Sequence, residues 1–282
     1  MRASTVDVNG IRLHCVEQGA GEPVVFIHMG GTDWRYWEAQ LPAFAARGWR
    51  AISYSRRFAR PNDNPLVSDY SPRVDAEDLE ALLVVLGALP AHLVGASIGG
   101  FAALLLALRR PAVVRSLVLA EPPILPWAGA TADGAVGLDA FDRTFWRPTR
   151  EAFRAGDAER AMATLMDYFV APGALASFPE RLRRRVLENA RDWEAHTLSS
   201  EPFPAPAREA VAALDVPVLL LSGERTLPLH RLVDAELESL LPRVRRETIP
   251  GASHDLWAER GDMCRELTLE FLGQVEKGAH RV

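Results

Sequence analysis

The sequence predicts an α/β protein, in which a mostly parallel sheet of about eight strands carries helices on both faces. Three observations support this fold class. Short, wholly apolar runs recur along the 282 residues, and such runs are typical of strands buried on both faces of a parallel sheet. Helical stretches alternate with these runs, which indicates βαβ units. The amino-terminal segment alternates polar and apolar residues on both sides of a turn, which predicts a hairpin.

The predicted elements follow one another in a regular order. The hairpin consists of residues 5–8 and 11–17 around Asn9-Gly10, a dipeptide that favours a two-residue turn. Later strand candidates lie at residues 24–27, 49–54, 92–96, 114–120, 216–222 and 245–249. The helical stretches that accompany them cover residues 36–47, 72–86, 98–109, 230–240 and 257–275.

The region 122–213 breaks this rhythm. It contains no convincing apolar strand, but it has paired prolines and amphipathic helical pieces at 158–170 and 179–197. We therefore expect a core domain formed by residues 1–121 and 214–282, with a helical cap, or lid, inserted at 122–213. The insertion is rich in aromatic residues, which either contact a substrate or pack its own small core. The candidates for substrate contact are Trp127, Trp146 and Trp193.

Composition narrows the classes of function. The formal net charge is −5, and no basic stripe suggests a nucleic-acid partner; we interpret the arginine-rich run 181–185 as a solvated helix face. The two cysteines match no metal-ligand spacing, and no nucleotide-binding motif is present. No apolar run reaches the roughly 18 residues that span a bilayer. We therefore expect a cytoplasmic monomer or homodimer that needs no metal or other cofactor and binds neither nucleic acid nor membrane.

The segment Gly95-Ala96-Ser97-Ile98-Gly99 matches G-x-S-x-G between a predicted strand and a predicted helix. A serine in this context occupies a tight, strained turn that lifts its hydroxyl above the sheet. Ile98 opens the following helix, where amides without a helical partner attract negative charge. We therefore predict that Ser97 is a nucleophile and that the Ile98 amide is one donor of an oxyanion hole.

This pattern, from Leu93 to Gly100, resembles the α/β-hydrolase superfamily, and the resemblance extends over most of the chain. It is weakest in the insertion. In that superfamily the order along the chain is nucleophile, acid and histidine, with the histidine in the loop after the last strand. His254 follows the strand at 245–249 and matches this order, whereas the other histidines fit worse. The resemblance implies that His254 is the general base.

The segment His28-Met29-Gly30 resembles the superfamily's oxyanion loop, although Met29 replaces the usual first glycine. By that resemblance the Gly30 amide completes the oxyanion hole, and His28 supports the loop rather than acting as a base. Met29 is a further candidate for substrate contact. Arg56, after the strand at 49–54, either pairs with a carboxylate and braces this loop or is solvated.

The acid is the point at which the sequence departs from the usual pattern. Thr226 stands where most members carry Asp, and a hydroxyl cannot stabilise an imidazolium as a carboxylate does. Glu121 immediately follows the strand at 114–120, a placement that resembles the zearalenone-opening lactonases of the superfamily. Since the carboxyl ends of parallel strands meet at one edge of the sheet, we predict Glu121 as the acid. Glu224 and Asp255 remain alternatives for the acid. If Glu121 is not the acid, it is a carboxylate with a structural role only.

These residues predict a hydrolase that cleaves a small-molecule carboxylic ester or lactone through an acyl-enzyme intermediate. Two alternatives remain open on this fold. One is a non-hydrolytic, cofactor-free enzyme of the lyase, cyclase or dioxygenase type, and the other is a ligand-binding protein without activity. Epoxide hydrolases and dehalogenases of the superfamily are disfavoured, because they carry Asp where Ser97 stands.

Overall fold

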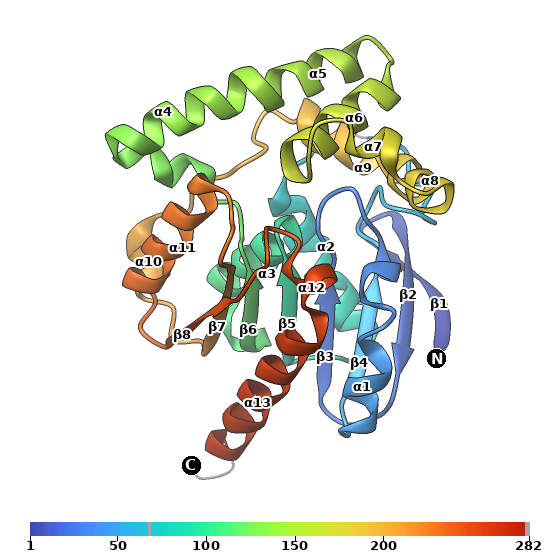
Figure 1. Ribbon diagram of the computed structural model, residues 1–282. Coiled ribbons are helices and arrows are strands. Elements are labelled where there is room, and N and C mark those ends of the chain that lie inside the picture. The colour runs from blue at the N-terminus through green and yellow to red at the C-terminus, as the bar shows by residue number, and fades with distance from the viewer. Residues whose placement is uncertain (67–68, 280–282) are drawn as a thin grey trace.

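A single sheet forms the centre of the molecule (Figure 1). The computed structural model describes residues 1–66 and 69–279. The sheet has eight strands in the order β1-β2-β4-β3-β5-β6-β7-β8. The β1–β2 and β2–β4 pairs are antiparallel, and the remaining neighbours are parallel. The strands are β1 (Arg2–Val8), β2 (Ile11–Gln18), β3 (Pro23–Ile27), β4 (Arg50–Tyr54), β5 (Ala91–Ala96), β6 (Val114–Ala120), β7 (Val218–Gly223) and β8 (Val244–Ile249).

Helices cover both faces of this sheet, which confirms the predicted fold class. One face packs against α2 (Pro72–Val85), α3 (Ile98–Arg109) and α11 (Pro228–Leu240). The other face packs against α1 (Leu41–Ala46), α12 (Leu256–Glu259) and α13 (Gly261–Ala279). Short helical turns complete the connections: η1 (Trp34–Trp37), η2 (Pro111–Val113), η3 (Leu125–Ala130) and α10 (Arg208–Ala212).

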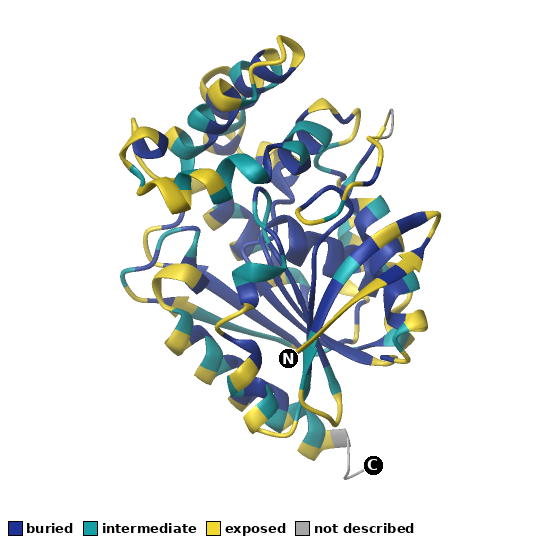
Figure 2. Ribbon diagram, turned by 90° about the vertical axis from the view of Figure 1, so that its right-hand side faces the viewer, coloured by how far each residue is buried: buried dark blue, intermediate teal, exposed yellow. Residues whose placement is uncertain are grey.

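The central strands are buried on both sides, as their apolar runs predict (Figure 2). In β3, Val25 and Ile27 belong to the core on the α2–α3 face, whereas Val24 and Phe26 belong to the core on the α1–α13 face. Successive side chains of a strand point to opposite faces. A strand between two helical layers therefore needs apolar residues at every position.

The chain between β6 and β7 is helical and lies beyond the carboxyl ends of the parallel strands, at the top of Figure 1. It contains α4 (Ala132–Phe141), a π-helical turn (Asp142–Trp146), α5 (Arg147–Arg154), α6 (Ala158–Phe169), α7 (Ala174–Ser177), α8 (Glu180–Glu188) and α9 (Ala190–Leu198). These helices share an apolar cluster of their own, which includes Phe145, Met162 and Trp193. These helices therefore cover the edge of the sheet at which the predicted site residues lie.

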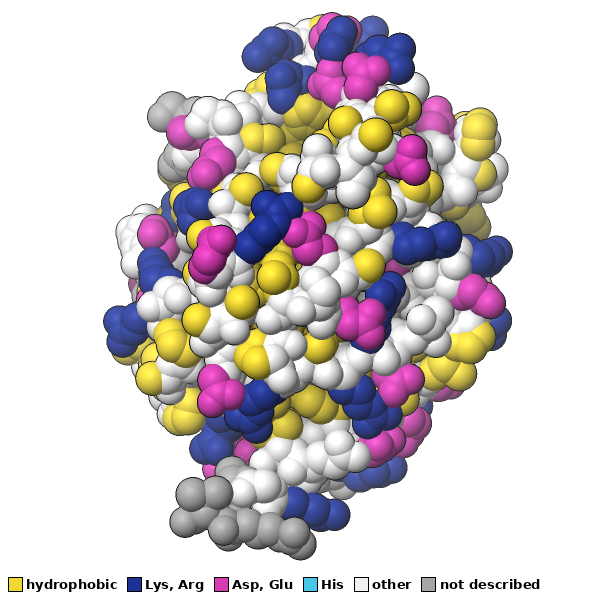
Figure 3. Space-filling view, turned by 90° about the vertical axis from the view of Figure 1, so that its left-hand side faces the viewer, with side chains coloured by type: hydrophobic (Ala, Val, Ile, Leu, Met, Phe, Trp, Pro, Cys, Tyr) yellow, Lys and Arg dark blue, Asp and Glu magenta, His cyan; other side chains and the backbone are white. Residues whose placement is uncertain are grey.

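No helix among the described residues is both long enough and apolar enough to cross a membrane. On the face drawn in Figure 3, basic and acidic side chains are interspersed and neither sign forms a continuous patch.

Candidate active site

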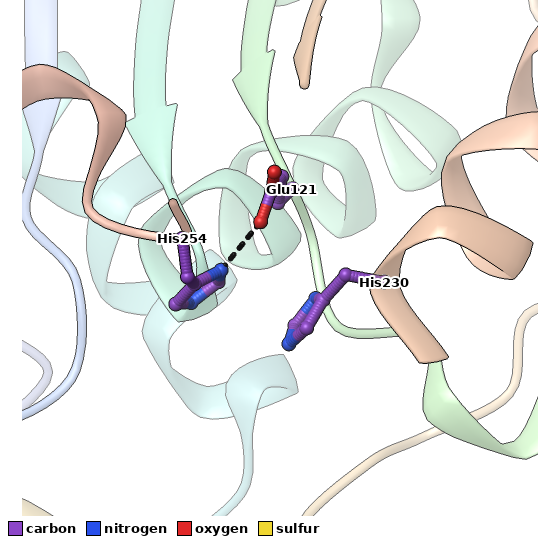
Figure 4. Close-up of side chains that lie close together, drawn as sticks. All are labelled: Glu121, His230 and His254. Atoms are coloured by element: carbon purple, nitrogen blue, oxygen red, sulfur yellow. Dashed lines mark hydrogen bonds and ion pairs between the residues drawn. The ribbon is translucent and has the colours of Figure 1, made fainter. Parts of the chain in front are cut away.

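Ser97, His254 and Glu121 form one hydrogen-bonded chain at the carboxyl edge of the sheet. Ser97 Oγ lies 3.1 Å from His254 Nε2, and His254 Nδ1 lies 2.6 Å from Glu121 Oε2. Figure 4 shows the second contact, with Glu121 at the end of a strand and His254 on a loop. The residues predicted as nucleophile, base and acid are thus brought together, although 157 positions separate the first two in sequence.

Ser97 occupies the strained turn that its sequence pattern predicts. Its φ is +50° and its ψ is −121°, a backbone conformation that costs free energy for a residue with a side chain. Two glycines permit the turn, because a Cβ on Gly95 would lie 2.5 Å from the Gly100 backbone and one on Gly99 would lie 2.4 Å from the Ile27 carbonyl. The turn leaves the Ser97 hydroxyl above the strand ends.

Glu121 follows β6 directly and is fully buried. Its φ is also +50°. Oε1 accepts a hydrogen bond from the Gly223 amide at 2.7 Å, and Oε2 accepts one from the Thr226 hydroxyl at 2.6 Å. The sequence alone does not predict this role of Thr226. The sequence did offer one sign of this role. Thr226 stands where a carboxylate that faces the catalytic histidine is usual, so its hydroxyl could be expected to lie near His254.

The two alternative acids lie elsewhere. Glu224 is exposed and accepts a hydrogen bond from the Gly251 amide at 2.7 Å. Asp255 accepts one from the Tyr36 hydroxyl at 2.7 Å. Of the three carboxylates considered, Glu121 is therefore the one that contacts the imidazole of His254.

The imidazole of His254 is packed between other rings. Phe169 stacks against it with a centroid distance of 5.2 Å, and His230 lies 4.3 Å away. Figure 4 shows His230 projecting from a neighbouring helix beside the other two side chains. Burial and the neighbouring His254 hold the pKa of His230 well below its usual value, so His230 stays neutral. The sequence alone does not predict this position of His230 beside the imidazole.

Glu121, His230 and His254 each offer a potential metal ligand, and these atoms lie within 4.8 Å of one another. A metal ion needs about 2 Å to each nitrogen or oxygen ligand. Two such ligand atoms around a tetrahedral ion lie about 3.3 Å apart, so the 2.6 Å contact between Glu121 and His254 is too short for an ordinary tetrahedral site. The geometry fits a hydrogen-bonded pair better than a metal centre.

His28 supports the predicted oxyanion loop. Its Nε2 accepts a hydrogen bond from the Arg56 amide at 2.9 Å, and its Nδ1 lies 2.8 Å from the Met29 carbonyl, to which it donates. Burial and the Arg56 charge lower the pKa of His28 to about 3. A neutral, fully buried ring with both nitrogens engaged can fix the loop but cannot exchange protons with a substrate.

Arg56 is paired, which decides between its two interpretations. Its guanidinium is 1% exposed and contacts Asp75 at 2.7 Å and Asp192 at 2.6 Å. Asp192 also accepts a hydrogen bond from the Gly31 amide at 3.1 Å. Arg56 thereby connects the strand layer to α9, through a carboxylate that also holds the predicted oxyanion loop.

A cavity of about 390 Å³ opens above Ser97. Met29 and Trp193 line it, as expected of substrate contacts, and Trp193 covers Gly30 and Gly31. Among the described residues, Trp127 and Trp146 are not part of its wall. Trp127 packs in the core of the sheet and donates to the Pro206 carbonyl, whereas Trp146 packs against Phe141 and Phe203. The apolar faces of these two residues are used in packing, so this cavity lends no support to the expectation that they contact a substrate.

Known proteins resemble this chain over most of its length. Residues 22–260 match the family described as alpha/beta hydrolase fold. A 2-hydroxy-6-oxononadienedioate/2-hydroxy-6-oxononatrienedioate hydrolase of Comamonas testosteroni is 24% identical over 277 residues, which cover 94% of this chain and 92% of the relative. Bifunctional epoxide hydrolase 2 of Sus scrofa is 22% identical over 93% of this chain, and this chain spans about half (53%) of that protein.

The solved structures agree with this match. The structure described as "Est816 as an N-Acyl homoserine lactone degrading enzyme" has a TM-score of 0.75 and 22% identity, and the match covers 95% of this chain and 100% of that chain. At this identity the likeness shows the fold, while the family match indicates a hydrolase. The chain therefore belongs to the α/β-hydrolase fold family.

Proposed function

We propose that the protein is a serine hydrolase that cleaves a carboxylic ester or lactone. The observation that carries this proposal is the unbroken chain from Ser97 Oγ through His254 to Glu121 at the floor of a cavity. A hydroxyl becomes an effective nucleophile when a neutral imidazole accepts its proton and a carboxylate stabilises the imidazolium that forms.

In the proposed reaction, Ser97 Oγ attacks the substrate carbonyl while its proton passes to His254 Nε2. The amides of Ile98 and Gly30 bind the resulting oxyanion, a role in which one donor is worth about 3 kcal/mol. The His254 imidazolium then protonates the leaving alkoxide, which frees an alcohol, or opens the ring of a lactone, and leaves an acyl-serine. His254 next takes a proton from water, and the resulting hydroxide attacks the acyl-serine carbonyl. When the bond between the acyl carbon and Ser97 Oγ breaks, His254 returns the proton to Oγ, which releases the carboxylic acid and restores both residues.

The cavity supports a substrate with an apolar body, because Leu165, Met166, Phe169 and Val186 form much of its wall. We propose that α6, α8 and α9 act as the cap that closes over this substrate. A serine nucleophile also argues against the epoxide hydrolase activity of the pig relative, because the superfamily's epoxide hydrolases are expected to carry Asp at this position.

The test is to treat the purified protein with a fluorophosphonate probe and to assay p-nitrophenyl esters and lactones. We expect an adduct on Ser97 by peptide mass spectrometry and ester turnover that disappears in Ser97→Ala. An adduct with no turnover of any ester, lactone or thioester would favour the non-hydrolytic alternative. If the probe forms no adduct, no substrate is turned over and Ser97→Ala binds ligands as the wild type does, the protein is a ligand-binding protein without activity.

A further inference from the structure

Most charged side chains in the cavity wall have partners of their own. Arg35 contacts Asp33 at 2.6 Å and Glu188 at 3.0 Å. Asp33 also accepts a hydrogen bond from Asn189 at 2.9 Å. Asp255, as described above, accepts from Tyr36. These groups satisfy one another and leave little capacity for a charged ligand.

Arg185 differs from them. Its side chain lines the cavity and is half-buried. Within residues 1–66 and 69–279, its guanidinium has neither a carboxylate partner nor a hydrogen-bond acceptor. Arg183, on the same helix, contacts both Glu159 and Glu180. Arg185 is thus a cation in the cavity wall whose charge no described side chain neutralises.

The helical period places Arg185 in the cavity. Leu182, Arg185, Val186 and Asn189 all line it, and their spacing of three, four and seven residues defines one face of α8. Arg181 and Arg184 lie outside that face and are exposed. The interpretation of the run 181–185 as a solvated face therefore holds for these two and is wrong for Arg185.

The surroundings of Arg185 favour binding of an anion. Val186 and Leu182 flank it on the helix, and Phe169 and Phe178 also line the cavity. Charges attract each other more strongly beside apolar walls than at an open surface. A guanidinium presents paired N–H groups that match the two oxygens of a carboxylate.

We propose that Arg185 binds a carboxylate of the substrate, so that the preferred substrates are esters or lactones with a carboxylate on the acyl part. This inference rests on the proposed function, since it assigns a substrate class to the same cavity. The scissile carbonyl lies at Ser97, and the apolar part of the acyl chain runs along the wall toward α8.

The test uses pairs of p-nitrophenyl esters that differ only in the terminal group: hydrogen succinate against butyrate, hydrogen glutarate against pentanoate, and hydrogen adipate against hexanoate. We expect the wild type to show a higher kcat/KM for the charged member of at least one pair, mainly through a lower KM. In Arg185→Leu the charged-to-neutral ratio for that pair should fall by about 10-fold to 100-fold, as for loss of a hydrogen bond to a charged group.

Arg184→Leu is the matched control, because Arg184 lies on the same helix and is exposed. The ratio should stay at the wild-type value in this variant. A wild type that prefers the neutral member of every pair, or an equal fall in both variants, would overturn the assignment of Arg185 while leaving ester hydrolysis intact.

Binding separates this inference from the proposed function. If no ester is turned over and Ser97 is not labelled, the proposed function fails, but Ser97→Ala can still be titrated with glutarate and with pentanoate. Tighter binding of glutarate that is lost in Ser97→Ala/Arg185→Leu would uphold the carboxylate site. Equal binding of the two acids would reject it.

Discussion

Glu121 is held by hydrogen bonds from a strand and loop to which it does not belong. The Gly223 amide at the end of β7 and the Thr226 hydroxyl just beyond it each donate to one oxygen of its carboxylate. His254 takes up the remaining position near Oε2. A buried carboxylate needs its lone pairs satisfied in this way, and the three donors fix its orientation toward the imidazole.

The first prediction is that Glu121→Gln lowers kcat by about a thousandfold to ten-thousandfold, because the amide cannot stabilise the imidazolium or hold its tautomer. Circular dichroism and thermal unfolding should show an intact fold. Glu224→Gln is the control and should retain near-normal kcat, since Glu224 contacts the Gly251 amide rather than His254. Near-normal activity in Glu121→Gln would remove the proposed acid.

The second prediction concerns Thr226, whose hydroxyl lies 2.6 Å from the carboxylate oxygen that contacts His254. Replacing Glu121 by Ala frees the space beside the imidazole, and Asp at position 226 would place a carboxylate there. We expect Glu121→Ala/Thr226→Asp to recover kcat by at least about tenfold over Glu121→Ala alone, a modest part of what the acid contributes. The single variant Thr226→Asp should not gain activity, because the new carboxylate would lie against that of Glu121 and the two negative charges would repel each other. If the double variant is as slow as Glu121→Ala, the side chain at position 226 does not reach the imidazole of His254, and the prediction is wrong.

The sequence predicts individual site residues where the signal is local. Ser97 is identified by its glycines and by the strand and helix around it, and His254 by its place after the last strand. Thr226, His230 and Arg185 were missed or misinterpreted, because their importance depends on residues far away in the chain. A hydroxyl or an arginine on a helix has many ordinary uses, and the three-dimensional neighbours decide among them.

At the scale of secondary-structure elements, Arg56 joins three segments in one buried cluster. It follows β4, Asp75 belongs to the first turn of α2, and Asp192 belongs to α9. Tyr70 adds a hydrogen bond to Arg56 at 2.9 Å. Because Asp192 also binds the Gly31 amide, the cluster fixes the roof of the cavity relative to the predicted oxyanion loop.

The third prediction is that Arg56→Met lowers the free energy of unfolding by about 3 to 5 kcal/mol, because it leaves Asp75 and Asp192 buried without their cation. Urea unfolding measures this change, and kcat should fall as well because the oxyanion loop loses its anchor. Arg73→Ala breaks an exposed pair with Glu201 and should cost less than about 1 kcal/mol. Equal costs in the two variants would mean that the cluster contributes no more than a surface pair.

The fourth prediction concerns His196 on α9, whose ring is enclosed by Trp146, Trp193 and Phe203. Neither of its nitrogens has a hydrogen-bond partner among the described residues, and burial lowers its pKa to about 3. Between pH 6.5 and about 3 the unfolded chain therefore binds a proton that the folded chain refuses, and stability falls as pH falls.

His196→Phe removes this proton linkage. The stability of the variant relative to wild type should rise by about 1.4 kcal/mol for each pH unit below 6.5. Urea unfolding of both proteins at pH 7.5, 6 and 5 measures the difference. A difference independent of pH would show that His196 binds protons equally in the folded and unfolded chains, and would contradict the prediction.

Elements were predicted well where the apolar pattern is strong. The helix expected at 98–109 is α3, and the piece expected at 158–170 is α6 apart from its last residue. The helices α4 and α5 were missed. Gly134 and Gly137 weaken the helical signal of α4, yet a Cβ at Gly134 would lie 1.9 Å from the Ala128 carbonyl. Close packing on η3 thus requires the glycine that lowers the helix propensity.

On the scale of the whole molecule, the apolar residues form three clusters, and Ile124, Trp127 and Val211 of the segment 122–213 belong to the core on the α2–α3 face. Two clusters lie on the faces of the sheet, and the third lies almost wholly within residues 122–213, with Leu229 as its contact from α11. We propose that this segment behaves as a cap domain on the core formed by residues 1–121 and 214–282.

The fifth prediction tests this division by native-state hydrogen exchange. Amides of β3 and β5 should open only with global unfolding, because they lie at the centre of the sheet. Amides of α6 and α8 should exchange through openings of lower free energy that leave the sheet protected. Identical opening free energies in the two regions would show that the chain unfolds as one cooperative unit.

The contact between Thr226 and Glu121 also bears on how proteins of this fold are recognised. A pattern search that requires Asp at the position of Thr226 would class this chain as inactive. In the structure, Glu121, which follows β6, contacts the same histidine. Thr226 donates a hydrogen bond to the Glu121 carboxylate. A carboxylate just after the neighbouring strand can thus contact the same histidine, and chains that lack Asp at the position of Thr226 merit inspection for a carboxylate one strand away.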